Sequence, residues 1–209
     1  MTRFLLLLAE SGFIPDYLIK VAARYISNRR LNEPNIHENK DKIISVLSQG
    51  AIAEKTYDAN EQHYEVPPEF FNYVLGENLK YSCSFFDDKN SLNEAEMNML
   101  NLYIDRADIT NDLEVLDLGC GWGSFSLYVA AKYPNTNITS VSNSSDQITF
   151  INNEAQKRGL SNINAFRMDV NNLDLNKKFD RIISIEMFEH VRNYKLILKA
   201  LNNVLKPDG

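Results

Sequence analysis

Three side chains that can accept a proton follow an apolar run near the end of the chain. The segment FDRIISIEMFEHV places Glu186, Glu189 and His190 after the strand pattern at 180–185. A carboxylate or a neutral imidazole can take the proton of an amine nucleophile and favour the positive charge that then develops on the nitrogen. A Glu-His pair is more often a surface or capping feature, so its position in the fold matters. Because these residues follow a strand pattern, Glu189 and His190 are candidates for direct chemical roles.

A glycine-rich segment supplies the second candidate site. EVLDLGCGWGS at 114–124 contains Asp117, Gly119, Gly121 and Gly123 between a strand pattern and a helix pattern. Glycine permits positive φ and lets a ligand approach the backbone. The dinucleotide pattern G-x-G-x-x-G holds a pyrophosphate, whereas the spacing here is G-x-G-x-G with an acidic residue close by. Since an acid repels phosphate and suits a sulfonium, the loop favours S-adenosylmethionine (SAM) over NAD.

Polar residues after the next two strand patterns complete the expected cofactor site. Ser142, Asn143 and Gln147 are candidate contacts for the ribose or the methionine, although Asn143 fits a turn or an N-cap equally well. Asp169 and Val170 follow the third strand pattern. There an Asp can accept a hydrogen bond from the exocyclic amine of adenine, and an apolar side chain can cover the ring. A plain turn aspartate is the alternative at Asp169.

These candidates need a scaffold, and the periodicity after Asn111 predicts one. Strands are expected at 113–118, 137–142, 163–167 and 180–185, and helices at 123–132, 145–158 and 193–205. Short apolar strands separated by helices predict parallel strands joined by right-handed crossovers. We therefore expect an α/β fold of the Rossmann-like class I methyltransferase type, which binds ligands at the carboxyl ends of its strands.

Residues 1–110 are expected to form a helical N-terminal region, and residues 111–209 the SAM-binding domain. Helical spacing recurs from residue 1 to about 56, with two prolines that favour several short helices, and again at 92–107. The chain stops at LKPDG after only four strand patterns. The C-terminal strands of such a fold are therefore expected to be missing.

The composition limits the classes of partner. The formal charge of −6, from 22 basic and 28 acidic side chains, gives no general electrostatic attraction for a phosphate backbone. We therefore exclude nucleic acid as a partner. Cys83 and Cys120 are too few for a disulfide framework and indicate a cytoplasmic location.

The apolar run at residues 4–9 is too short for an export signal or a membrane span, and the amphipathic stretch 14–32 allows at most peripheral membrane contact. No metal site is predicted, and the oligomeric state is left open.

Taken together, the motifs resemble the cyclopropane fatty acid synthase family and, more closely, its coclaurine N-methyltransferase-like branch. The sequence resemblance extends from about residue 12 to residue 209. It includes SGFIPDYLI, ANEQHYEVPPEFF, LKYSCSFF, LDLGCGWGS, SNSSDQ, FDRIISIEMFEHVRNY and LKPDG. The glycine loop alone marks methyltransferases in general, whereas YSCSFF together with EMFEH is far more specific to this family.

The resemblance implies a SAM-dependent transferase whose active site lies under a helical N-terminal cover and cap region, here residues 1–110. Tyr81 and Ser82 match cofactor contacts of the family. The stretches 118–126 and 142–147 match further cofactor contacts, and they bring Leu118, Cys120 and the loop glycines into the expected site.

The resemblance leaves two substrate classes open. In cyclopropane synthases, a bicarbonate bound partly by the Glu matching Glu189, and near the Cys matching Cys83, takes a proton from a carbocation. In the amine-methylating branch, the residues matching Glu189 and His190 serve the substrate nitrogen. The segment ANEQHYEVP differs from the HYDxGNxFY motif of the lipid-modifying enzymes. This difference favours an amine as the methyl acceptor. We expect a small-molecule amine as methyl acceptor. A lipid acyl chain is the alternative substrate, and a truncated, non-catalytic SAM-binding protein is the alternative function.

Overall fold

The computed structural model describes residues 11–12, 14–32, 40–54, 68–88 and 91–209. The chain divides into two compact units, residues 1–44 and 45–209, which we call the N-terminal unit and the main unit and describe separately. The functional boundary expected between residues 110 and 111 stays a prediction.

The N-terminal unit contains helix α2 (Asp16–Leu31) and most of α3 (Lys40–Val46). These two helices agree with the short helices expected before residue 56. Apolar side chains of α2 are exposed, among them Tyr17 and Tyr25. Within the described residues, no helix combines the length and the apolar character that crossing a membrane requires.

Four parallel strands form the centre of the main unit. They are β1 (Glu114–Leu118), β2 (Asn137–Ser142), β3 (Ile163–Arg167) and β4 (Arg181–Ile183), in the spatial order β3-β2-β1-β4. Val115 of β1 lies opposite Ile138 of β2 and Arg181 of β4. The strand order therefore reverses between β1 and β4. In open parallel sheets, the crevice at the carboxyl ends of such strands binds ligands.

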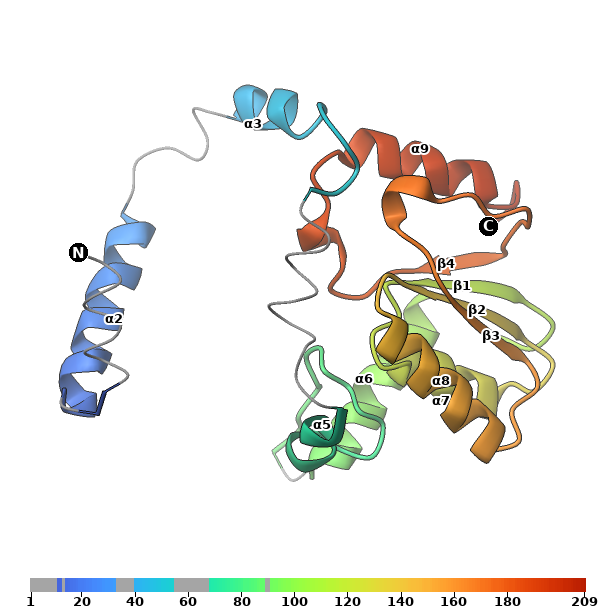
Figure 1. Ribbon diagram of the computed structural model, residues 1–209, viewed down its shortest axis with the longest axis horizontal. Helices are drawn as coiled ribbons and strands as arrows, with labels where there is room; N and C mark the ends of the chain where they lie inside the picture. Colours follow the sequence, from blue (N-terminus) through green and yellow to red (C-terminus); the bar gives the residue numbers. More distant parts are fainter. Residues whose placement is uncertain (1–10, 13, 33–39, 55–67, 89–90) are drawn as a thin grey trace. The chain divides into compact units, whose positions relative to one another are not determined.

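Helices cover both faces of this sheet. The main unit contains α5 (Pro68–Val74), α6 (Leu92–Arg106), α7 (Ser124–Lys132), α8 (Ser145–Lys157) and α9 (Tyr194–Val204), with the 3-10 turns η1 (Val170–Asn172) and η2 (Phe188–His190). Figure 1 shows α7 and α8 on one side of the strands and α9 on the other. Successive side chains of a strand point to opposite faces. Val115 accordingly packs in one core cluster with Leu100 of α6 and Val129 of α7, whereas Leu116 packs in another with Ile197 of α9.

The expected α/β arrangement is confirmed, and most element bounds agree within two residues. The strand expected at 180–185 is shorter because the chain leaves the sheet after Ile183. The Ser184 hydroxyl then donates to the Leu118 carbonyl at 2.9 Å, and Glu186 adopts a left-handed φ of 50°. The strands expected after the last residue of the chain stay a prediction.

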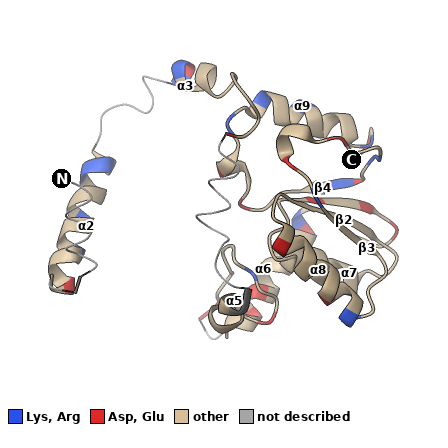
Figure 2. Ribbon diagram, in the orientation of Figure 1, with Lys and Arg blue, Asp and Glu red and all other residues tan. Residues whose placement is uncertain are grey.

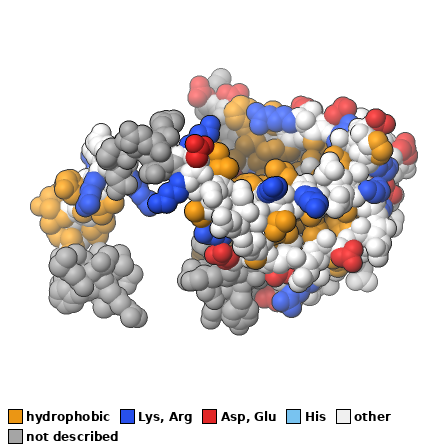
Figure 3. All heavy atoms as spheres, turned by 90° about the horizontal axis from the view of Figure 1, so that it is seen from above, with side chains coloured by type: hydrophobic (Ala, Val, Ile, Leu, Met, Phe, Trp, Pro, Cys, Tyr) orange, Lys and Arg blue, Asp and Glu red, His pale blue; other side chains and the backbone are white. Residues whose placement is uncertain are grey.

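Charged side chains of both signs are spread over the main unit. Figure 2 shows basic and acidic positions on many of its elements. Seen from above, apolar atoms lie between the charged ones (Figure 3), and α9 exposes Leu196 and Leu198. The described surface is therefore of mixed charge.

Candidate active site

The carboxyl end of β1 leads into a loop that is tied to the neighbouring strand. The amides of Gly119 and Cys120 donate to the Val141 carbonyl of β2, at 2.8 and 3.0 Å. Asp117 of β1 is buried, and its carboxylate accepts a 2.6 Å hydrogen bond from the Ser126 hydroxyl of α7. Strand, loop and helix are therefore held together as one base for a ligand.

Burial sets the protonation state of Asp117. It raises the pKa of this carboxyl to about 6, and the hydrogen bond from Ser126 opposes the shift. The carboxyl is therefore mainly ionised at pH 7 and mainly protonated at pH 5. A negative charge at the base of the loop favours a cationic ligand.

The three glycines of the loop have positive φ but different neighbours. A Cβ atom at Gly119 would lie 2.5 Å from Cγ of Met187, and one at Gly123 would lie 2.6 Å from Cγ1 of Ile151. Within the described part of the chain, nothing lies within 4 Å of a Cβ at Gly121. The loop therefore leaves side-chain space for a ligand at Gly121, whereas protein side chains occupy that space at the other two positions.

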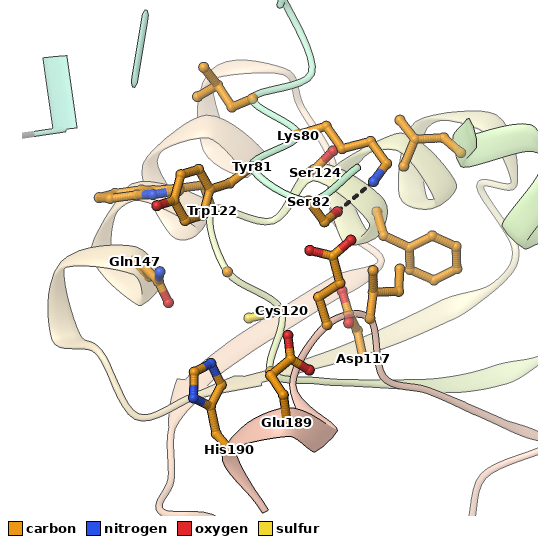
Figure 4. Close-up of a pocket in the computed structure, with 17 residues that line it drawn as sticks. Lys80, Tyr81, Ser82, Asp117, Cys120, Trp122, Ser124, Gln147, Glu189 and His190 are labelled. Atoms are coloured by element: carbon orange, nitrogen blue, oxygen red, sulfur yellow. Dashed lines mark hydrogen bonds between the residues drawn. The ribbon is translucent and has the colours of Figure 1, made fainter. Parts of the chain in front are cut away.

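Two cavities flank the loop. The Lys80 cavity, of about 280 Å³, is lined by residues that include Lys80, Tyr81, Ser82, Asp117, Cys120 and Trp122 (Figure 4). The Asp169 cavity, of about 310 Å³, is lined by residues that include Leu118, Ser142, Asn143, Asp169 and Val170. Both cavities share Gly119, Gly121, Gln147, Glu186, Glu189 and His190. The structure thus gathers most of the predicted site residues around one loop, where a single elongated ligand can contact both cavities.

Two predicted site residues, Cys83 and Gly123, line neither cavity. The Cys83 amide donates to the Glu186 carboxylate at 2.9 Å, and its exposed thiol lies 3.9 Å from the Tyr103 hydroxyl. Gly123 is the N-cap of α7. The functional roles expected for these two residues, and for those that do line the cavities, stay predictions.

Glu189 and His190 reach the shared wall from the tight turn η2 after β4. The His190 amide donates to the Met187 carbonyl at 2.9 Å, and the Tyr194 hydroxyl donates to the Phe188 carbonyl at 2.8 Å. Figure 4 shows the Glu189 and His190 side chains projecting from this turn toward the cavity. Two groups that can accept a proton therefore lie beside the glycine loop.

Three buried donors at the loop point to a ligand. The Ser142 hydroxyl donates to Oε1 of Gln147 at 2.7 Å, while Nε2 of Gln147 has no partner among the described residues. Within the same described residues, Nε1 of Trp122 and the Ser124 hydroxyl are also buried without a partner. An unsatisfied buried polar group costs about 1–3 kcal/mol. A ligand with hydrogen-bond acceptors would satisfy these atoms.

Asp169 has a structural role, which the sequence leaves as an alternative. Its carboxylate accepts from the Asn171 amide at 2.8 Å and caps η1. The Asn171 side chain in turn accepts from the Ala53 amide at 2.9 Å and donates to the Ala53 carbonyl at 3.0 Å. This pairing fixes one wall of the Asp169 cavity. The expected adenine contact of Asp169 stays a prediction.

The sequence does not predict several residues that line the cavities. Lys80 stands beside the predicted Tyr81, and this adjacency is the signal that could identify it, whereas Trp122 and Ser124 lie within the stretch 118–126 that the family resemblance already implies. Ala53 and Glu54 precede the glycine loop by a long stretch of chain, so no local pattern marks them.

The donors and the charge of the site fit SAM. Its carboxylate, ribose hydroxyls and adenine nitrogens offer partners to the unpaired atoms of Trp122, Ser124 and Gln147. Its cationic sulfur suits a site with the ionised Asp117 at its base. The space at Gly121 lets such a ligand approach the backbone.

Comparison with known protein families identifies the family of this chain. A model of the family described as mycolic acid cyclopropane synthetase matches residues 51–209. The chain belongs to the mycolic acid cyclopropane synthetase family. Two curated proteins show how this family member relates to others. (S)-coclaurine N-methyltransferase from Thalictrum flavum subsp. glaucum is 40% identical over 207 residues, which are 96% of this chain and 57% of that protein.

The second relative is more distant. Cyclopropane-fatty-acyl-phospholipid synthase from Escherichia coli (strain K12) is 31% identical over 159 residues, which are 74% of this chain and 40% of that protein. The chain therefore spans less than two thirds of the length of these relatives.

A solved structure confirms the methyltransferase fold of this family member. The crystal structure of coclaurine N-methyltransferase bound to N-methylheliamine and S-adenosylhomocysteine (SAH) matches with a TM-score of 0.92 and 38% identity. The match covers 100% of this chain and 62% of that one. The expected Rossmann-like class I fold is thus correct.

Proposed function

We propose that the protein is a SAM-dependent methyltransferase that transfers a methyl group to the nitrogen of a small-molecule amine. The observation that carries this proposal is the wall shared by the two cavities, where the open space at Gly121 adjoins Glu189 and His190. A cofactor loop and two proton acceptors therefore line one site. The 40% identity to (S)-coclaurine N-methyltransferase supports the amine as acceptor.

The residues assigned to the cofactor divide between the two cavities. Tyr81 and Ser82 of the Lys80 cavity suit the amino-acid end of SAM, whereas Asp169 and Val170 of the Asp169 cavity suit the adenine. Gln147 lines both cavities and carries an unpaired donor for the middle of the ligand. When bound, SAM supplies a methyl group activated by a positively charged sulfur.

The protein then contributes alignment and a proton acceptor. Holding two reactants in line is worth up to about 7–11 kcal/mol, and a positioned base contributes about 10²- to 10⁴-fold. Either Glu189 or His190 takes the single proton of the amine, because a protonated amine has no lone pair for attack. When the imidazole holds this proton, the Glu189 carboxylate favours the positive charge that develops on the nitrogen.

The substrate class is tested with methyl-labelled SAM and separate pools of small amines and cell lipids. We expect label in N-methyl products, at a rate that rises from pH 7 to pH 9 as free amine accumulates. Label found only in cyclopropane or methyl-branched acyl chains would contradict the amine and support the cyclopropane synthase alternative, with bicarbonate near Glu189 and Cys83. Binding of SAM without transfer to either pool would support the non-catalytic alternative.

The raised pKa of Asp117 predicts that SAM affinity depends on pH. Because the folded protein ionises Asp117 near pH 6, affinity for the cationic cofactor should rise by roughly three- to tenfold between pH 5 and pH 7. Calorimetry with SAM across this range measures the effect. The variant Asp117→Asn keeps the shape of the side chain and removes its ionisation. The affinity of this variant for SAM should therefore not depend on pH in this range. A rise that persists in this variant would assign the effect to another group.

We also propose a cytoplasmic location, and a division into a cover at residues 1–110 and a SAM-binding domain at 111–209. Cys83 and Cys120 are free thiols, which suits a reducing compartment. Fractionation of cells that produce the protein tests the location. Expression of the two predicted segments, apart and together, tests the boundary.

A further inference from the structure

A buried lysine beside the proposed cofactor site lacks a carboxylate partner. Lys80 is only 3% exposed and lines the Lys80 cavity. Its ammonium donates to the Ser82 hydroxyl and, at 3.3 Å, to the Tyr103 hydroxyl (Figure 4 shows the first of these). Among the residues that the structure describes, no Asp or Glu oxygen lies within 4.0 Å of this ammonium.

Two neutral hydroxyls satisfy hydrogen bonds but do not neutralise the charge. Burial lowers the pKa of Lys80, and Cys83, Glu186 and Glu96 oppose this shift through longer-range electrostatics. A buried ammonium is costly unless an anion pairs with it. An ammonium has three N–H donors, and the two hydroxyls use two of them. One donor and the positive charge therefore remain for a ligand.

A buried carboxylate that acts on Lys80 electrostatically is committed to the backbone. Glu96 of α6 is fully buried and accepts hydrogen bonds from the amides of Gly76 at 2.8 Å, Asn78 at 3.0 Å and Lys80 at 3.3 Å. Asn93, one turn earlier, accepts from the Glu77 amide at 2.9 Å. These bonds fix the backbone that carries Lys80, and they leave the Lys80 ammonium without Glu96 as a direct partner.

Other unpaired donors line the same cavity. Nε1 of Trp122 and the Ser124 hydroxyl are buried without partners among the described residues, and both residues line the Lys80 cavity. Helix α7 begins at Ser124, and the amides of a helix start favour an anion. The cavity thus combines one positive charge with several donors that suit a carboxylate.

We infer that Lys80, with Ser82 and the start of α7, forms a carboxylate-binding subsite that receives the α-carboxylate of the cofactor. The inference rests on the proposed function, because SAM and SAH both carry this carboxylate. Gly121 lines the same cavity, so a ligand seated on the glycine loop can extend its amino-acid end toward Lys80.

Calorimetry with two ligands tests the subsite. One ligand is SAH, and the other is S-adenosyl-3-thiopropylamine, which lacks only the carboxylate. We expect the wild-type protein to bind SAH about 10- to 100-fold more tightly than the analogue, the range for hydrogen bonds between charged groups. Lys80→Met keeps an unbranched side chain and removes the charge, so it should lose most of this preference while its affinity for the analogue stays nearly constant. Lys80→Arg keeps the charge and should retain a preference for SAH.

Other outcomes separate this inference from the proposed function. Equal weakening of both ligands by Lys80→Met would assign a structural role to Lys80, and unchanged SAH affinity would exclude the contact. A wild-type protein that binds both ligands equally overturns the subsite even if the variant does not fold. A wild-type protein that binds neither ligand contradicts the proposed function itself. Lys199→Met, at an exposed position of α9, is the matched control and should change neither affinity.

Discussion

Replacing Gly121 with valine is expected to weaken SAH binding by more than about 100-fold, a loss of over about 2.8 kcal/mol. Two causes act together. Gly121 has a φ of 53°, which a β-branched residue adopts at a cost of about 1–3 kcal/mol. The valine side chain would also enter the space that is open at this position, where the two cavities meet. Calorimetric titration with SAH measures the loss.

Gly159 provides a matched control for this variant. It has a φ of 68°, nothing lies within 4 Å of a Cβ built on it among the described residues, and it lines neither cavity. Gly159→Val should therefore lower the thermal stability through the same backbone cost but leave SAH affinity unchanged. Gly121→Ala should give an intermediate affinity. If folded Gly121→Val binds SAH normally, the loop does not hold the cofactor at this position.

The variant Glu189→Gln is expected to lose about 10²- to 10⁴-fold in kcat, the usual contribution of a positioned base. Its SAH affinity should stay within about threefold of the wild-type value, because the amide keeps the shape of the side chain and the loop contacts of the cofactor are intact. Transfer from methyl-labelled SAM measures turnover, and calorimetry measures affinity. Raising the pH should partly restore the variant, since amines then lose their proton without a base.

Glu77→Gln is the matched control, because Glu77 is exposed and lines neither of the two cavities that flank the glycine loop. It should leave both turnover and affinity unchanged. Equal losses of turnover and SAH affinity in Glu189→Gln would instead show that Glu189 supports the structure of the site. His190→Gln, measured in the same way, separates the imidazole from the carboxylate as the main proton acceptor.

The sequence by itself determines the layers of the main unit and the edge of the sheet that carries the site. Alternating strand and helix patterns are local properties, so β2 and β3 have the predicted bounds, and the glycine loop and η2 follow strands as expected. Parallel strands carry their carboxyl ends at one edge, which brings Gly121 and Glu189 together although they are distant in the chain. The SAM-type loop and the proton acceptors are therefore recognisable from the sequence.

Only the tertiary structure decides which of these residues have space around them. A glycine pattern does not reveal that Met187 and Ile151 fill the space at Gly119 and Gly123, because those side chains come from other elements. The solvent exposure of a lysine is likewise not determined by the neighbouring sequence. Lys80 is buried because α6 holds its backbone through Glu96. Space and charge in the site depend on contacts between segments far apart in the sequence, and these form only when the sheet and its helices pack together.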